Sequence, residues 1–147
     1  MGYRPGMAFE PRSKVKQKSA FGRVALDLEP ANGVDASDHL FQAARMQHRL
    51  AFAVNEQLRL RGTTVSRHMK RVAWAPGLSG ERQLRVLRGE TSATYADLVF
   101  WISQYETVAQ VMAEHLMSLA AAPSNEDDSA AKSSPSTEAR PSTPPRN

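Results

Sequence analysis

The sequence predicts an all-α fold: a small four- to five-helix bundle that contains a helix-turn-helix, with disordered N- and C-terminal tails. Apolar residues recur at helical spacing through residues 36–122, and Ser, Thr or Asp stands where several helices are predicted to begin. Eight of the nine prolines lie outside that region. A chain of 147 residues, 41% of them hydrophobic, has room for one domain of this kind. We therefore predict a helical domain at residues 36–122, between a flexible arm at 1–35 and a disordered tail at 123–147.

The first 35 residues show no sustained apolar period and are predicted to form the flexible arm. Three prolines and four glycines interrupt them. The segment carries a basic run with two interpretations, of which we favour a solvated leader over a basic arm that lies along a DNA groove. The run consists of Arg12, Lys14, Lys16 and Lys18.

A long first helix is predicted to begin near Ser37 or Asp38, either of which can accept hydrogen bonds from free backbone amides of the first turn. It is predicted to end at Gly62, which can adopt the left-handed conformation of a helix C-terminus. Because this helix is longer than a small domain usually needs, we expect its first half to pack on a partner subunit. Its buried stripe is Leu40, Ala44, Gln47, Ala51, Val54 and Leu58.

Two short helices follow, each with an apolar inner face and a basic outer face. The first starts at Thr63 or Thr64 and turns Val65, Met69 and Val72 inward, which leaves Ser66, Arg67, Lys70 and Arg71 outside. Residues 74–77 are predicted to form a turn around Pro76. The next helix is capped by Ser79, carries Glu81 near the positive end of its dipole and ends at Gly89. We expect Leu78, Leu84 and Leu87 to face inward, and Arg82, Arg85 and Val86 to face outward.

Residues 94–122 contain neither Gly nor Pro and are predicted to form two helices with a bend near Tyr105, or one long helix. Phe100, Trp101 and Tyr105 together add aromatic surface that suggests a subunit interface, whereas core filling is the expected use of any single one of them. The last 25 residues contain five prolines and six serines, so they bury too little apolar area to offset the entropy of ordering.

Basic residues are dense in residues 59–90, where eight Arg or Lys side chains stand against two glutamates. A local positive field on a compact pair of helices attracts a phosphate backbone, because each neutralised phosphate releases condensed counterions. Arginine can also bind guanine O6 and N7 with two hydrogen bonds in the major groove. We therefore expect Arg82 and Arg85 to read bases and the surrounding cations to contact phosphates.

The segment RVLRGE at residues 85–90, preceded by a Ser-capped short helix and followed by a Thr-x-x-x-Leu helix start, resembles the Cro/repressor, or Xre-type, helix-turn-helix family. The resemblance covers about residues 50–105. It implies a dimer whose third helix enters the major groove while the second crosses the backbone. By position it implies that Ser79, Glu81, Arg82 and Arg85 face bases. The residues expected at phosphates are Arg61, Thr64, Arg67, Lys70, Arg71 and Arg88.

The chain departs from the family pattern in three places. Residues 73–78 make a longer connection between the two short helices than is usual. Gln83 stands where an aliphatic core residue is common, with Leu84 beside it, which leaves two registers open for the third helix. Lys70 occupies a position where a small residue often lets the two helices approach closely.

No motif in the sequence indicates another class of function. The chain has no cysteine, its four histidines lack metal-ligand spacing, and it contains no Gly-rich phosphate loop and no G-x-S-x-G elbow. We therefore expect no enzyme activity, cofactor, metal or small-molecule substrate. No run of about 18 apolar residues predicts a membrane span. We expect a cytoplasmic, nucleoid-associated homodimer.

The leading hypothesis is a sequence-specific, repressor-like transcriptional regulator that binds double-stranded DNA. The alternative is a helical protein-protein interaction module that makes no direct DNA contact and whose basic face only keeps it soluble. RNA binding is disfavoured, because no exposed aromatic residues for base stacking stand beside the basic helices.

Overall fold

The structure, a computed structural model, describes residues 9–72 and 78–121. These residues contain no strand, and the all-α prediction is confirmed. The predicted turn at 74–77 and the predicted tail at 123–147 lie outside the described residues. Two short 3-10 turns, η1 (Pro11–Lys14) and η2 (Lys18–Ala20), precede five helices: α1 (His39–Leu60), α2 (Val65–Val72), α3 (Gly80–Leu87), α4 (Tyr95–Gln104) and α5 (Glu106–Ala121).

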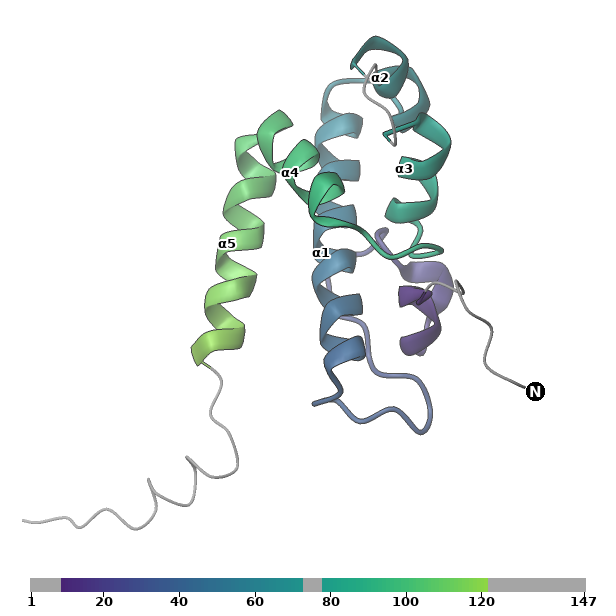
Figure 1. Cartoon of the computed structure of the whole chain (residues 1–147), viewed down its shortest axis with the longest axis vertical. Helices are drawn as coiled ribbons and strands as arrows, with labels where there is room; N and C mark the ends of the chain where they lie inside the picture. Colours follow the sequence, from purple (N-terminus) through teal and green to yellow (C-terminus); the bar gives the residue numbers. More distant parts are fainter. Residues whose placement is uncertain (1–8, 73–77, 122–147) are drawn as a thin grey trace, which may run out of the picture.

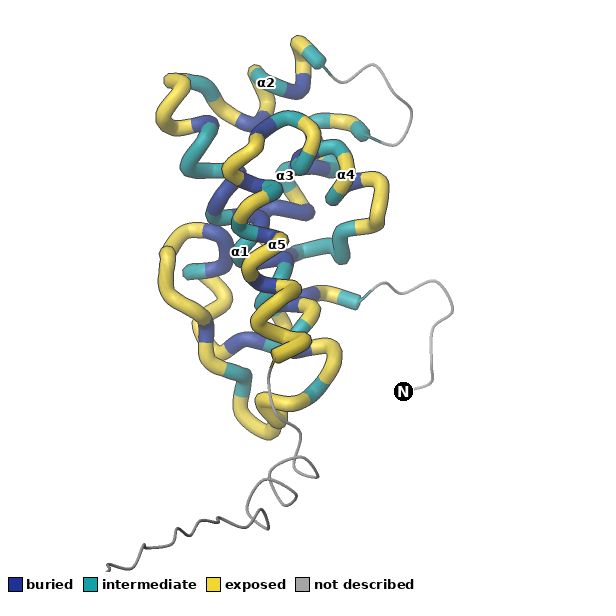
Figure 2. Tube along the Cα trace, turned by 90° about the vertical axis from the view of Figure 1, so that its left-hand side faces the viewer, coloured by how far each residue is buried: buried dark blue, intermediate teal, exposed yellow. Residues whose placement is uncertain are grey.

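Helix α1 is the centre of the molecule, and η1, α2, α3 and α5 all pack against it (Figure 1). The Asp38 carboxylate caps it by accepting hydrogen bonds from the backbone N–H groups of Leu40 at 2.7 Å and Phe41 at 3.4 Å. The helix ends just before Gly62, as predicted. Figure 2 shows the buried residues gathered at the centre, while the outer face of α5 is exposed. The α1 side chains with no exposed surface are Ala44, Leu50, Ala51 and Val54.

The two short helices form where they were predicted, but the register of α3 is the one that places Gln83 in the core. Thr64 caps α2, whose Val65 and Met69 are buried. In α3 the buried residues are Gln83, Val86 and Leu87. The prediction that Val86 faces outward is therefore wrong. Leu84 is half-buried and lies at the edge of the core.

Residues 94–121 form two helices, because the backbone of Tyr105 is extended (φ −139°, ψ 121°). A capping box between Thr94 and Asp97 starts α4. Trp101 and Tyr105 are buried in the hydrophobic core and Phe100 is half-buried against it, so core filling, the expected use of a single aromatic, is confirmed for Trp101 and Tyr105. None of the described helices combines the length and apolarity needed to cross a bilayer.

The N-terminal segment differs from the flexible arm that was predicted for it. From residue 9 onward it packs on the helices, with Val15, Phe21 and Leu28 in the hydrophobic core. An isolated β-bridge joins Val15 to Pro30 and closes the segment on itself. This packing covers one side of the first half of α1, where Phe41, Ala44, Gln47 and His48 are buried. Leu40, which was predicted on the buried stripe, is 45% exposed, so that part of the prediction is wrong.

Candidate nucleic-acid interface

The outer face of α2 is basic. The helix turns Val65 and Met69 into the core, which leaves Arg67, Lys70 and Arg71 exposed. Within the part of the chain that the structure describes, none of these three cations makes a salt bridge. Their charges are therefore available to a phosphate backbone.

Helix α3 presents a mixed face. The Ser79 hydroxyl caps the helix by accepting a hydrogen bond from the backbone N–H of Arg82 at 3.2 Å. Arg85 donates to Glu81 at 3.1 Å, one turn earlier, and both side chains are exposed. Exposed pairs of this spacing contribute only about 0.3–0.5 kcal/mol, so Arg85 can leave Glu81 for a base edge at little cost. Arg88, at the end of the helix, is also exposed.

A hollow of about 440 Å³ joins the outer faces of α2 and α3. The two helices approach closely at Gly80, where an added Cβ would lie 3.3 Å from the Cβ of Met69. The small residue that allows this close approach is therefore Gly80 of α3, and not a residue at the Lys70 position of α2, where the family usually has it. The hollow is lined by Ser66, Met69 and Lys70 of α2 and by Ser79, Gly80, Glu81 and Leu84 of α3.

Arg82 does not project freely from α3. Its Nε and Nη2 donate to the two carboxylate oxygens of Asp97 in α4, at 3.2 and 2.6 Å. The Arg82 side chain is 26% exposed and that of Asp97 only 1%. This two-point contact makes Arg82 a positioning residue that joins α3 to α4, and its geometry does not support the predicted contact with a base.

Asp97 is a buried carboxylate with a full set of donors. Burial by itself raises the pKa of Asp97, but hydrogen bonds from Arg82, Thr94 and Gln83 outweigh burial and hold the pKa below the ordinary carboxyl value. Thr94 donates its backbone N–H at 2.8 Å and its hydroxyl at 3.0 Å, and Gln83 donates its amide at 2.7 Å. Asp97 is therefore ionised at neutral pH and keeps Arg82 in place.

Two buried glutamines fix the position of α3, and the role of neither was predicted from the sequence. Gln83 accepts a hydrogen bond from Nε1 of Trp101 at 2.8 Å. Gln47 of α1 donates to the backbone carbonyls of Val86 and Thr91 at 2.7 and 2.8 Å. The sequence could have indicated these roles, because an amide side chain at a core position requires hydrogen-bond partners.

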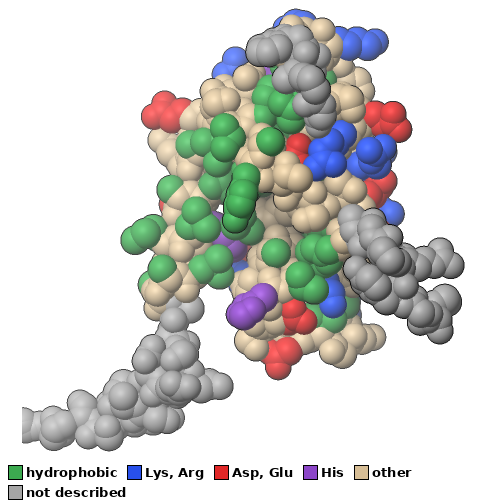
Figure 3. Space-filling model, in the orientation of Figure 1, with side chains coloured by type: hydrophobic (Ala, Val, Ile, Leu, Met, Phe, Trp, Pro, Cys, Tyr) green, Lys and Arg blue, Asp and Glu red, His purple; other side chains and the backbone are tan. Residues whose placement is uncertain are grey.

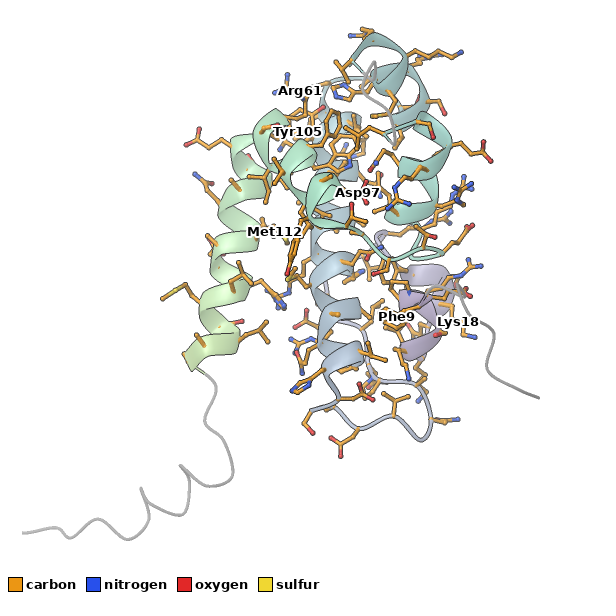
Figure 4. The ribbon with its side chains drawn as sticks, in the orientation of Figure 1. Phe9, Lys18, Arg61, Asp97, Tyr105 and Met112 are labelled. Atoms are coloured by element: carbon orange, nitrogen blue, oxygen red, sulfur yellow. The ribbon has the colours of Figure 1, made fainter. Side chains whose placement is uncertain are left out.

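Arg61 lies apart from the basic face of α2 and α3. Its guanidinium carbon is 4.9 Å from the centre of the Tyr105 ring, a cation–π contact at the junction of α4 and α5 (Figure 4). Its predicted phosphate contact therefore has no geometric support.

Two of the histidines, His48 and His68, make hydrogen bonds that stabilise the fold. Nδ1 of His48 accepts a hydrogen bond from the backbone N–H of Gly22 at 2.8 Å, so its Nε2 carries the proton and donates to the Leu26 carbonyl at 2.9 Å. Nε2 of His68 pairs with the Gln104 amide at 3.2 Å. Across residues 9–72 and 78–121, no three His, Asp or Glu side chains gather as a metal-ligand set.

Comparison of the chain with protein-family models, with curated proteins and with solved structures found no match. The resemblance to Cro/repressor proteins therefore depends only on the residues of the chain itself.

Proposed function

We propose that this protein is a sequence-specific, repressor-like transcriptional regulator that binds double-stranded DNA through α2 and α3. The observation that carries the proposal is the division of these two helices into a buried inner face and a basic outer face. In Figure 3 most of the visible Lys and Arg side chains lie along the edge formed by α2 and α3, with acidic side chains among them, and many of the hydrophobic side chains lie over α4 and α5. The exposed cations of that edge are Arg67, Lys70, Arg71, Arg85 and Arg88.

The two helices have different roles in this proposal. Cations of α2 neutralise phosphates and fix the register of the protein on the duplex, a contribution independent of sequence. Arg85 leaves Glu81 and donates to O6 and N7 of guanine in the major groove, while Glu81 can accept from the amino group of cytosine. The hollow that joins α2 and α3 lies between these two sets of contacts.

Selection of bound duplexes from a random DNA pool tests the proposal, with Arg85→Ala and Arg82→Ala compared separately. We expect the wild type to enrich a motif that Arg85→Ala blurs at defined positions, at about 1–3 kcal/mol per lost guanine contact. Arg82→Ala should lower stability and leave the motif unchanged, because Asp97 holds the Arg82 guanidinium. No enrichment by the wild type would overturn DNA binding. A motif blurred by Arg82→Ala alone would overturn the assignment of Arg85.

A second candidate function is a helical protein-protein interaction module that makes no direct DNA contact. It is favoured by exposed apolar side chains on α4 and α5. These apolar side chains are Tyr95, Val99, Leu116, Met117 and Leu119. The dependence of binding on salt concentration distinguishes the two candidates, because phosphate binding weakens steeply between about 50 and 200 mM salt and apolar association barely changes.

We assign the same apolar face to a homodimer, since a dimer places two recognition helices on a two-fold DNA site. Sedimentation equilibrium of the full chain should give twice the 16.2 kDa mass of one chain. A monomer at micromolar concentration would contradict the dimer without affecting the assignment of α3.

A further inference from the structure

A second basic surface lies beside the C-terminal end of α3. Two hollows of about 360 and 310 Å³ adjoin there, and both are lined by Phe21, Arg23 and Arg88. The N-terminal segment, α1 and α3 all contribute charged side chains to them. These are the cations Arg12, Lys18, Arg23, Arg59 and Arg88 and the carboxylates Glu56 and Glu90.

The carboxylates of this surface already have partners. Nη2 of Arg59 lies 2.6 Å from the Glu56 carboxylate. Arg12 pairs through Nε with Glu10 at 2.8 Å, and its Nη1 lies 3.7 Å from the Glu90 carboxylate. Three exposed cations then remain without a salt bridge to any residue that the structure describes: Lys18, Arg23 and Arg88. The surface is net positive, and these three side chains are its cations without an ion pair among the described residues.

The backbone between Lys18 and Arg23 is fixed to the end of α3. The Phe21 ring lies so close to Gly89 that a Cβ there would be 2.8 to 2.9 Å from three ring carbons. Gly22 approaches α3 as closely, since a Cβ on it would lie 2.7 Å from the Leu87 carbonyl oxygen. Both glycines have positive φ, +73° and +75°, which other residues rarely adopt.

Hydrogen bonds hold the same segment to α1. The Gly22 N–H donates to His48, and the Asn55 amide donates to the Gly22 carbonyl at 3.1 Å. The Arg12 N–H donates to the Gly89 carbonyl at 2.9 Å. Lys18 and Arg23 therefore extend from a backbone whose position relative to α3 is fixed.

We infer that Lys18, Arg23 and Arg88 bind the phosphate backbone of double-stranded DNA next to the segment that α3 reads. The inference rests on the proposed function and extends it to the N-terminal segment. Lys18 lies on the same side of the molecule as α3, so one duplex can reach both (Figure 4). Because the segment is already ordered, it contributes phosphate contacts without the entropic cost of ordering a flexible arm on binding.

The dependence of duplex affinity on salt tests this inference with the full chain. Each lost phosphate contact reduces the slope of log K against log salt concentration by about 0.9. We expect the double variant Lys18→Ala/Arg23→Ala to reduce the slope by about 1.8. The matched control Lys14→Ala/Lys16→Ala removes the same charge from the same segment, outside both hollows, and should change the slope much less.

A third variant, Arg67→Ala/Arg71→Ala, separates this inference from the proposed function. If it reduces the slope and Lys18→Ala/Arg23→Ala does not, the second surface is refuted and the helix-turn-helix assignment stands. If the wild type shows no salt-dependent duplex binding, both fail. Hydroxyl-radical footprinting on the selected site gives a second readout. The Lys18→Ala/Arg23→Ala variant should lose protection at one end of each half-site and keep it elsewhere.

Discussion

Asp97 accepts hydrogen bonds from Arg82 and Gln83 of α3 and from Thr94 at the start of α4. Its loss therefore affects both the start of α4 and the position of α3. Asp97→Ala leaves the buried donors of Gln83 and Thr94 without an acceptor and Arg82 without its counter-ion. We expect it to lower the free energy of unfolding by about 3 kcal/mol. Arg82→Ala should cost less, about 1–2 kcal/mol, because Asp97 keeps its other donors and Arg82 is partly exposed.

Urea unfolding of both variants checks this order, provided the dependence of the free energy on urea is the same in each. An Asp97→Ala protein as stable as Arg82→Ala would contradict the role given to the buried carboxylate. Circular dichroism of the folded states shows whether the helices are retained.

Sequence spacing could not separate Arg82 from Arg85. Both were predicted on the outer face of the third helix, and the difference between them is set by Asp97, 15 residues further along the chain. Thr94 and Asp97 together form a capping box, and their spacing can be recognised from the sequence alone. The buried Gln83 beside Arg82 was the second local sign that a polar network crosses from α3 to α4.

Among the elements, the N-terminal segment is held to α3 by a contact that one glycine makes possible. Gly89→Ala should destabilise the protein by about 1–3 kcal/mol more than Gly33→Ala. Both positions have positive φ, so both variants bear the same backbone strain. Only at Gly89 would the new methyl group meet the Phe21 ring, whereas no atom lies within 4 Å of a Cβ at Gly33.

Thermal unfolding of the two glycine variants measures that difference, and hydrogen exchange locates it. The amides of Phe21 and Arg23 should lose protection in Gly89→Ala while those in the middle of α5 keep theirs. Equal destabilisation by the two substitutions would mean that the N-terminal segment contributes nothing to stability through this contact.

The positions of α1 to α4 were predictable because the start of each has a local sign in the sequence. The caps of α1, α3 and α4 are side chains adjacent to the helices they begin. The N-terminal segment has no such sign. Its order comes from distant partners, such as Gly22 with His48 and Asn55, which are 26 and 33 residues away. A rule based on local composition therefore predicted a flexible arm where tertiary contacts make an ordered one.

At the scale of the whole molecule, the buried His48 and His115 and the half-buried His68 should make stability depend on pH. Burial is the main cause that lowers the pKa of His48, His68 and His115 below the ordinary value of 6.5. His115 has no exposed surface, and neither ring nitrogen has a hydrogen-bond partner among the described residues. Protonation of His48 on Nδ1 would also break its hydrogen bond from Gly22.

Because each folded-state pKa lies below the unfolded value, the unfolded chain binds more protons as pH falls below about 6.5. The free energy of unfolding should therefore be highest above that pH and decrease toward pH 5, by up to about 1.4 kcal/mol per pH unit for each histidine. His115→Leu should reduce this dependence by one proton and stabilise the protein more at pH 5 than at pH 8. His39→Leu, which removes a histidine from an exposed position, is the control. Urea unfolding between pH 5 and 8 measures all three proteins, and a pH profile that His115→Leu does not alter would show that His115 is not buried in the neutral form.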